Sequence, residues 1–285
     1  IAAFSYFRSA EMLERAAGDL LARIARQTVA ETESLLRPVE ASVGLLALNA
    51  VSEAGTLAER RAGLGVLREA LRATPSVSAY YVGYASGDFF MLMRLADDAD
   101  RRLVGAPAGA AYLIQSIAGP QGQFLYLDAD LHELRADPRP DYPATYDPRQ
   151  RSWYVQAQGS VEPVQTEPYL FASTRRLGVT VARRTASGRA VVGADIRLAT
   201  LDETLRRQRI TPGSQLVLFD GGQRVVACSE PDWLLPEAAG GEIERPRLSG
   251  LAHGGVAALA RQAPQAGAGA DQALVAFDGA GRGWH

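Results

Sequence analysis

The chain has 285 residues, of which 47% are hydrophobic and 22% are charged, so it is long enough for one large core or two smaller ones. Its formal net charge of −2 gives no overall attraction to nucleic acid, and we expect no nucleic-acid partner. The single cysteine, Cys228, excludes an intramolecular disulfide. The longest apolar stretch, residues 43–51, is too short to span a membrane, so we expect membrane attachment only through flanking spans absent from this chain.

The first quarter of the chain is predicted to be helical. Apolar residues recur at helical spacing over residues 9–49, which indicates one long amphipathic helix with a kink at Pro38. At about 1.5 Å per residue this helix would measure roughly 60 Å, longer than the core of an ordinary domain, so we interpret it as a stalk. Residues 53–75 predict a second, shorter helix that ends at Pro75.

After residue 76 the pattern changes to β-rich segments with period two. Residues 77–85 and 88–95 predict a hairpin, and residues 110–117 and 123–131 extend it to a meander of four strands. Residues 136–150 contain four prolines and are predicted to form no regular element before a short helix that begins near Arg151. Three further strands, at 168–174, 177–185 and 189–196, and an amphipathic helix at 198–208 close this unit.

A second, smaller unit repeats the same order. Strands are predicted at 214–220 and 224–229, followed by a helix near 250–262 and a strand at 272–278. The predicted fold class is α+β, with a long N-terminal helix followed by two tandem units that contain antiparallel sheets. The expected domains are a stalk at 1–50, a first unit at 51–209 and a second at 210–285.

Motifs of the common enzyme classes are absent from the sequence. The three histidines do not stand at metal-ligand spacing, and we expect no metal site. The sequence has no phosphate-binding loop, dinucleotide-binding turn or nucleophile elbow, and it has no lysine for a pyridoxal Schiff base. We therefore expect no cofactor and no catalytic activity in this chain.

Residues 145–154, TYDPRQRSWY, concentrate aromatic and cationic side chains in a chain with only 7% aromatic residues. One interpretation is structural: Trp153 and Tyr154 fill the core while Arg149 and Arg151 pair with Asp147 or face solvent. The alternative is a carboxylate-binding site, because an arginine can bind a carboxylate with two hydrogen bonds and an indole N–H adds a third. The composition of the segment leaves both open.

Three segments of the chain together resemble a known family. They are residues 146–154 (YDPRQRSWY), residues 168–169 (PY) and residues 191–196 (VVGADI). The resemblance is to the double Cache sensor domain of bacterial membrane receptors, in its amino-acid-sensing branch, and it covers nearly the whole chain. It implies two PAS-like (Cache) units after the stalk, with the ligand in the membrane-distal first unit.

The resemblance also implies which residues hold the ligand carboxylate. Arg151 and Trp153 match the family's R-x-W-Y motif, although Ser152 replaces the proline often found between them. Both side chains would bind the carboxylate, and Tyr146 would close the pocket wall.

On the ammonium side, the resemblance implies three further residues. Tyr154, Tyr169 and Asp195 would face the ligand's ammonium group. The match of Tyr169 depends on a single dipeptide, and Asp195 could instead cap the helix near residue 198.

By this resemblance, the chain would be the periplasmic or extracytoplasmic sensor of an inner-membrane receptor. Its output domain would be a nucleotide cyclase, a histidine kinase or of the chemotaxis type, and the N-terminal helix would form a homodimer. A biogenic amine or a small carboxylate is the alternative ligand. A solute-binding protein, an enzyme and a dimerisation module without a ligand are the alternatives of other classes.

Overall fold

The computed structural model describes residues 36–174, 176–207, 214–219, 223–230, 247–250 and 277–278, together with five positions between 23 and 34. Two compact units make up the chain. One is Leu35–Arg197, and the other combines residues 1–34 with residues 198–285.

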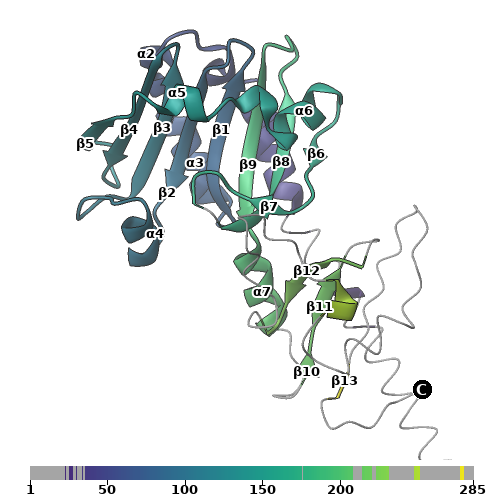
Figure 1. Ribbon diagram of the computed structural model, residues 1–285. Coiled ribbons are helices and arrows are strands. Elements are labelled where there is room, and N and C mark those ends of the chain that lie inside the picture. The colour runs from purple at the N-terminus through teal and green to yellow at the C-terminus, as the bar shows by residue number, and fades with distance from the viewer. Residues whose placement is uncertain are drawn as a thin grey trace, which may run out of the picture. The chain divides into compact units, whose positions relative to one another are not determined.

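A nine-stranded antiparallel sheet forms the centre of the unit Leu35–Arg197 (Figure 1). Its strand order is β5-β4-β3-β2-β1-β9-β8-β6, and β7 also pairs with β8. The strands are β1 (Val77–Tyr84), β2 (Phe89–Arg94), β3 (Tyr112–Ala118), β4 (Gln121–Leu127), β5 (Glu133–Pro138), β6 (Val164–Gln165), β7 (Tyr169–Leu170), β8 (Leu177–Arg184) and β9 (Ala190–Arg197). The predicted α+β class and the four-stranded meander are confirmed.

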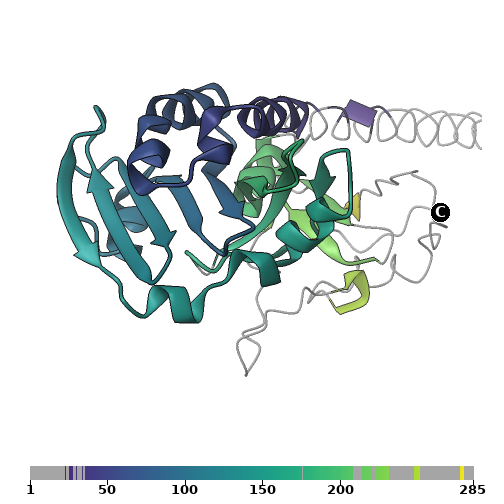
Figure 2. The same ribbon diagram turned by 90° about the horizontal axis from the view of Figure 1, so that it is seen from above.

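Helices cover both faces of this sheet (Figures 1 and 2). The helical residues 36–47, α2 (Leu57–Ala62) and α3 (Leu64–Ala73) lie on one face. The segment between β5 and β6 crosses the other face and contains α5 (Tyr142–Thr145), η2 (Pro148–Gln150) and α6 (Ser152–Gln158). Because both faces are covered, every residue of the central strand β1 is buried.

The predicted helix at 53–75 is in fact two helices. Gly63 separates α2 from α3 and packs closely against the 3-10 helix η1 (Ala50–Glu53), since a Cβ at residue 63 would lie 2.8 Å from the side chain of Val51. A capping box between Thr56 and Glu59 begins α2. The segment between residues 50 and 63 is therefore folded back closely on itself.

Several elements form where the sequence pattern predicts none, including α5 and η2 within residues 136–150, which were expected to contain no regular element. Strand β5 begins before the segment expected to be irregular and ends inside it. It pairs with β4 at the edge of the sheet, where Pro138 is tolerated because an edge strand does not need every backbone N–H for pairing. Every residue of β5 is exposed or half-buried, and its sequence ELRADP lacks the β-branched and aromatic residues that predict a strand. Helix α4 (Asp98–Leu103) begins at Asp97, whose carboxylate accepts a hydrogen bond from the Asp100 N–H.

The unit boundaries differ from the expected ones at residues 50 and 209. Helix α7 (Leu198–Arg207), expected to close the first unit, belongs to the second. Its Asp202 accepts a 2.9 Å hydrogen bond from the backbone N–H of Cys228, in strand β12 (Val225–Cys228). The interactions of α7 with the strands that follow it therefore assign this helix to the second unit. The helical period of its sequence cannot show such interactions.

The second unit contains two short antiparallel pairs in its described part. Strand β11 (Val217–Phe219) pairs with β12, and β10 (Ser214–Gln215) pairs with β13 (Phe277–Asp278). A 3-10 helix, η4 (Leu248–Gly250), precedes the expected helix near 250–262, which lies outside the described residues beyond residue 250. The same holds for the start of the predicted stalk helix and for most of the strand at 272–278. No helix among the described residues has the length and apolarity that a membrane span needs.

Candidate functional site

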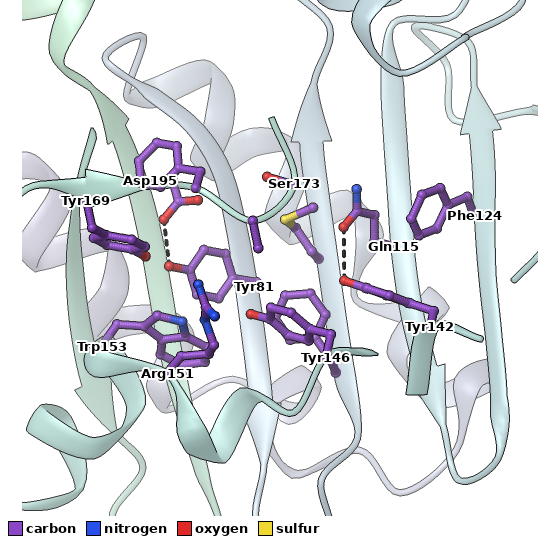
Figure 3. A pocket seen from close by; sticks show the side chains of 14 residues that line it. Tyr81, Gln115, Phe124, Tyr142, Tyr146, Arg151, Trp153, Tyr169, Ser173 and Asp195 are labelled. Carbon is purple, nitrogen blue, oxygen red and sulfur yellow. Dashed lines mark hydrogen bonds between the residues drawn. The ribbon is translucent and has the colours of Figure 1, made fainter. Parts of the chain in front are cut away.

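A cavity of about 220 Å³ lies between the sheet and the crossing segment that contains α5 and α6 (Figure 3). All of its lining residues come from the unit Leu35–Arg197. They are Tyr81, Phe89, Met91, Gln115, Phe124, Tyr142, Tyr146, Arg151, Trp153, Tyr169, Phe171, Ala172, Ser173 and Asp195. Most are aromatic or apolar, so the few polar groups among them determine what the cavity can bind.

The floor of the cavity is a row of side chains on four neighbouring strands. Tyr81 on β1 is paired with Met91 on β2, Met91 with Gln115 on β3, and Gln115 with Phe124 on β4. Residues directly opposite one another in an antiparallel sheet project from the same face. The register therefore brings these four side chains to the cavity together.

A glycine makes room for the first ring of this row. Gly193 on β9 is paired with Tyr81, and a Cβ at this glycine would lie 2.2 Å from the ring carbon Cε2. The ring can lie across β9 only because residue 193 has no side chain. This placement allows the Tyr81 hydroxyl to reach Asp195.

Asp195 lies at one end of the cavity with only 5% of its surface exposed. Its Oδ1 accepts hydrogen bonds from the Tyr81 hydroxyl at 2.6 Å and from the Thr180 hydroxyl at 2.7 Å. No residue in the described part of the chain donates to Oδ2. Burial raises the pKa of Asp195 to about 7, although the two hydrogen bonds and the nearby charge of Arg151 lower it.

Tyr169 extends this hydrogen-bond chain. Its hydroxyl lies 2.7 Å from the Thr180 hydroxyl, which donates its own hydrogen to Asp195, so Tyr169 is the donor to Thr180. Burial and the neighbouring Asp195 raise the pKa of Tyr169, which keeps the phenol neutral. The expected ammonium-side residues Tyr169 and Asp195 are thus connected through a threonine that sequence reasoning did not select.

Arg151 stands at the N-cap of α6, and its guanidinium carbon lies 5.6 Å from the centre of the Tyr146 ring. Its guanidinium forms no ion pair or hydrogen bond with any residue that the structure describes. Arg149, two residues earlier, instead forms a 2.8 Å ion pair with Asp147. Of the two interpretations of this segment, the structural one therefore fits Arg149, whereas Arg151 lines the cavity without a carboxylate partner.

Contacts between aromatic rings form the remaining walls of the cavity. Trp153 is 1% exposed, and its ring centre lies 4.9 Å from that of Tyr81 in an edge-on arrangement. The ring of Tyr146 lies 4.9 Å from Phe89 and 5.5 Å from Tyr142. These contacts fix the position of the walls before any ligand is present.

Five of the six residues expected at the site line the cavity, namely Tyr146, Arg151, Trp153, Tyr169 and Asp195. The sixth, Tyr154, does not. Its ring packs edge-on against Trp153, and its hydroxyl accepts a hydrogen bond from the Gln158 side chain at 3.2 Å. Consecutive residues of a helix point about 100° apart, so the two aromatic residues of α6 face different directions.

Sequence reasoning missed the residues that the sheet and the loop after β7 contribute. From the sheet come Tyr81, Phe89, Met91, Gln115 and Phe124; from α5 comes Tyr142; and from the loop come Phe171, Ala172 and Ser173. A polar glutamine within the apolar strand YLIQSIA was the one available signal. A polar residue in the middle of a buried strand indicates a function or a hydrogen-bond partner.

The charges of the cavity define its chemistry. Arg151 and Asp195 are the only charged side chains among its described lining residues. A cavity with one cation and one anion matches a small zwitterion. No group of three potential metal ligands occurs among the described residues.

Known proteins resemble the chain over much of its length. No family model matches it. The chain is 32% identical to adenylate cyclase 1 of Rhizobium meliloti over 210 residues, which cover 72% of the chain and 31% of the cyclase. It is 36% identical to the methyl-accepting chemotaxis protein PctB of Pseudomonas aeruginosa over 128 residues, covering 44% and 20%. The chain thus spans about a third or less of these relatives.

Solved structures show the fold. The sensory domain of the Campylobacter jejuni chemoreceptor Tlp3 matches with a TM-score of 0.51 at 18% identity, covering 80% of the chain and 76% of that domain. The Tlp3 ligand-binding domain in complex with L-valine also matches with a TM-score of 0.51 at 18% identity, covering 81% and 77%. The fold indicated by the sequence motif is therefore confirmed: the chain has the double Cache fold of bacterial chemoreceptor sensor domains.

Proposed function

We propose that the chain is the ligand-binding sensor domain of a membrane receptor and that it binds an α-amino acid in the cavity of the unit Leu35–Arg197. One observation carries this proposal. Arg151, which has no carboxylate partner among the described residues, lines the same cavity as the buried Asp195. An α-amino acid supplies a carboxylate and an ammonium group, one for each of these charges.

In the proposed complex, Arg151 and the indole N–H of Trp153 bind the ligand carboxylate. Asp195 accepts from the ammonium group, Tyr169 lies beside it, and Tyr146 forms the wall. Each charge-assisted hydrogen bond would contribute about 1.5–3 kcal/mol. The volume of about 220 Å³ supports a ligand of this size, because pockets for drug-sized molecules measure about 300–1,000 Å³.

None of the alternatives uses both Arg151 and Asp195. A biogenic amine would use Asp195 and the tyrosines but leave the guanidinium unpaired. A small carboxylate would bind Arg151 but leave Asp195 without a cation, and a dimerisation module has no use for either residue. The charge pair thus favours an amino acid.

We further propose that this chain has no catalytic activity, lies outside the cytoplasm and acts as a homodimer through its N-terminal helix. Two large apolar side chains near the end of this helix support the dimer, because Leu45 is 71% exposed and Leu48 is 80% exposed. The relatives include a cyclase and chemotaxis proteins, so the same sensor fold is compatible with either output.

A thermal-shift screen against amino acids, amines and small carboxylates, followed by calorimetry on the best ligand, tests the proposal. Arg151→Ala should weaken amino-acid binding by roughly 10- to 150-fold, the effect of losing a charge-assisted contact of about 1.5–3 kcal/mol. The matched control is Arg149→Ala, which removes an exposed, ion-paired arginine two residues away and should retain the parent affinity. Equal affinities of the parent and Arg151→Ala would contradict the proposal.

A further inference from the structure

We propose that Gln115 selects the ligand, and that the preferred amino acid has a long, uncharged side chain ending in a hydrogen-bond acceptor, such as the carboxamide of glutamine. This inference rests on the proposed function, because it assumes that Arg151 and Asp195 hold the α-carboxylate and α-ammonium groups. It concerns the opposite end of the same cavity, where Gln115, Phe124 and Tyr142 lie (Figure 3).

Gln115 is a buried polar residue in the floor of the cavity. It is only 3% exposed, and its two partners across the sheet, Met91 and Phe124, are apolar. A buried polar side chain is costly unless its hydrogen-bonding groups are satisfied. The way in which Gln115 is satisfied therefore indicates what the cavity binds.

One half of the Gln115 amide has a partner within the protein. The Tyr142 hydroxyl donates to Oε1 at 3.0 Å, and Phe124 holds the Tyr142 ring edge-on at 5.3 Å between ring centres. This hydrogen bond fixes the orientation of the amide. The Nε2 group donates to no residue in the described part of the chain, although the side chain lines the cavity. Its two hydrogens are thus available to an acceptor on a ligand.

The lack of a free charged side chain near Gln115, in the part of the cavity that the structure describes, indicates that the acceptor on the ligand is neutral. Arg151 and Asp195, the charged side chains among the described lining residues, are both used by the α-groups in the proposed complex. A ligand carboxylate beside Gln115 would have no cation, and a ligand ammonium or guanidinium group would have no anion. A neutral carbonyl oxygen accepts from Nε2 without burying an unpaired charge.

The width of the sheet sets the length of the ligand side chain. Asp195 is on β9 and Gln115 is on β3, and β1 and β2 lie between them. Three strand spacings of about 4.8 Å amount to about 14 Å across the sheet. Asp195 is paired with Ala79, two residues along β1 from Tyr81, so it is also displaced from the row of Gln115 along the strand direction. A ligand that contacts both groups must therefore be long, which favours a side chain of the length of glutamine over the shorter asparagine, and Met91 and Phe89 would contact its methylene groups.

Calorimetry with four amino acids tests the inference on the parent chain. L-Glutamine should bind about 5- to 150-fold more tightly than L-norleucine, which has a similar shape but leaves the Nε2 donors unpaired. L-Glutamate should be weaker because of its charge, and L-asparagine because of its length. Norleucine binding as tightly as glutamine would overturn the inference while leaving amino-acid sensing intact. Binding of none of the four would overturn this inference, and binding of no amino acid in the wider thermal-shift screen would overturn the proposed function as well.

A pair of variants assigns the preference to Gln115. Gln115→Leu keeps a similar volume but removes both donors, so the ratio of glutamine to norleucine affinity should fall to about one or invert. The matched control is Gln123→Leu on β4, where residue 123 is paired with Ser116 and faces the other side of the sheet, so the parent ratio should remain. A ratio unchanged in Gln115→Leu would overturn the role of this residue. Should Gln115→Leu fail to fold, the ligand series on the parent still decides the inference.

Discussion

Proton release from Asp195 is a direct consequence of the proposed binding mode. In the ligand-free protein, burial raises the pKa of this carboxyl group to about 7. A ligand ammonium group beside it would favour the ionised form and lower the pKa again. Binding below pH 7 must therefore expel the proton that the carboxyl group carries.

The pKa of Asp195 sets the size of this effect. With a pKa of about 7 in the free protein, about 0.9 of the carboxyl groups are protonated at pH 6 and about 0.1 at pH 8. Amino-acid binding should therefore release roughly one proton per site at pH 6 and almost none at pH 8. The apparent affinity should rise roughly tenfold between these two pH values.

Calorimetry in two buffers with different ionisation enthalpies measures the released protons at each pH. Asp195→Asn, which does not titrate, is the control: it should bind the ligand more weakly, and the binding heat that it retains should be the same in both buffers. A parent protein whose binding heat at pH 6 does not depend on the buffer would refute either the protonated state of Asp195 or its contact with the ammonium group.

The same pKa predicts the pH dependence of stability without ligand. The folded pKa lies above the ordinary value of 3.8, so the folded state binds the proton more tightly than the unfolded state. This contribution to stability is complete below pH 3.8 and is lost as the pH rises through about 7. In urea unfolding between pH 5 and 8, the parent should therefore lose stability relative to Asp195→Asn. Parallel pH profiles would contradict the raised pKa.

Three further variants test the packing of the site and the proposed dimer. Trp153→Ala should lose about 3–5 kcal/mol of unfolding free energy and Arg151→Ala much less, because only the tryptophan fills core volume; equal melting temperatures would show otherwise. Gly193→Ala should lose about 1–3 kcal/mol and also ligand affinity, since its methyl group would displace the ring opposite; unchanged denaturant unfolding would argue against this close packing. Replacing Leu45 and Leu48 together by glutamate should weaken self-association in analytical ultracentrifugation without changing ligand affinity. Self-association equal to that of the parent would show that these two residues are not in the dimer interface.

The sequence by itself determined the order of the main strands in the first unit and the segment that contributes Arg151 and Trp153 to the cavity. Strands β1 to β4 have strong local signals, because β-rich runs are separated by turn residues such as Gly87 and Pro120. The segment at 145–154 was recognisable because its arginine, tryptophan and tyrosines lie within ten residues. Local features of this kind need no knowledge of distant contacts.

The tertiary structure decided which side chains face the cavity. In β1 every residue is buried, so the burial pattern cannot distinguish the face of Tyr81 from the opposite one. Gln115 reaches the same floor only through the register that pairs it with Met91 and Phe124. Register is a property of strand pairing, and a one-residue slip would move each side chain to the other face.

The same distinction applies to the helices. Trp153 and Tyr154 are equivalent as sequence signals, yet the orientation of α6 on the sheet directs only the tryptophan into the cavity. Helix α7 has a clear amphipathic period, but only its interaction with β12, as between Asp202 and Cys228, assigns it to the second unit. A sequence period shows that a helix has an apolar face, and the packing partner that covers this face is decided only when the chain folds.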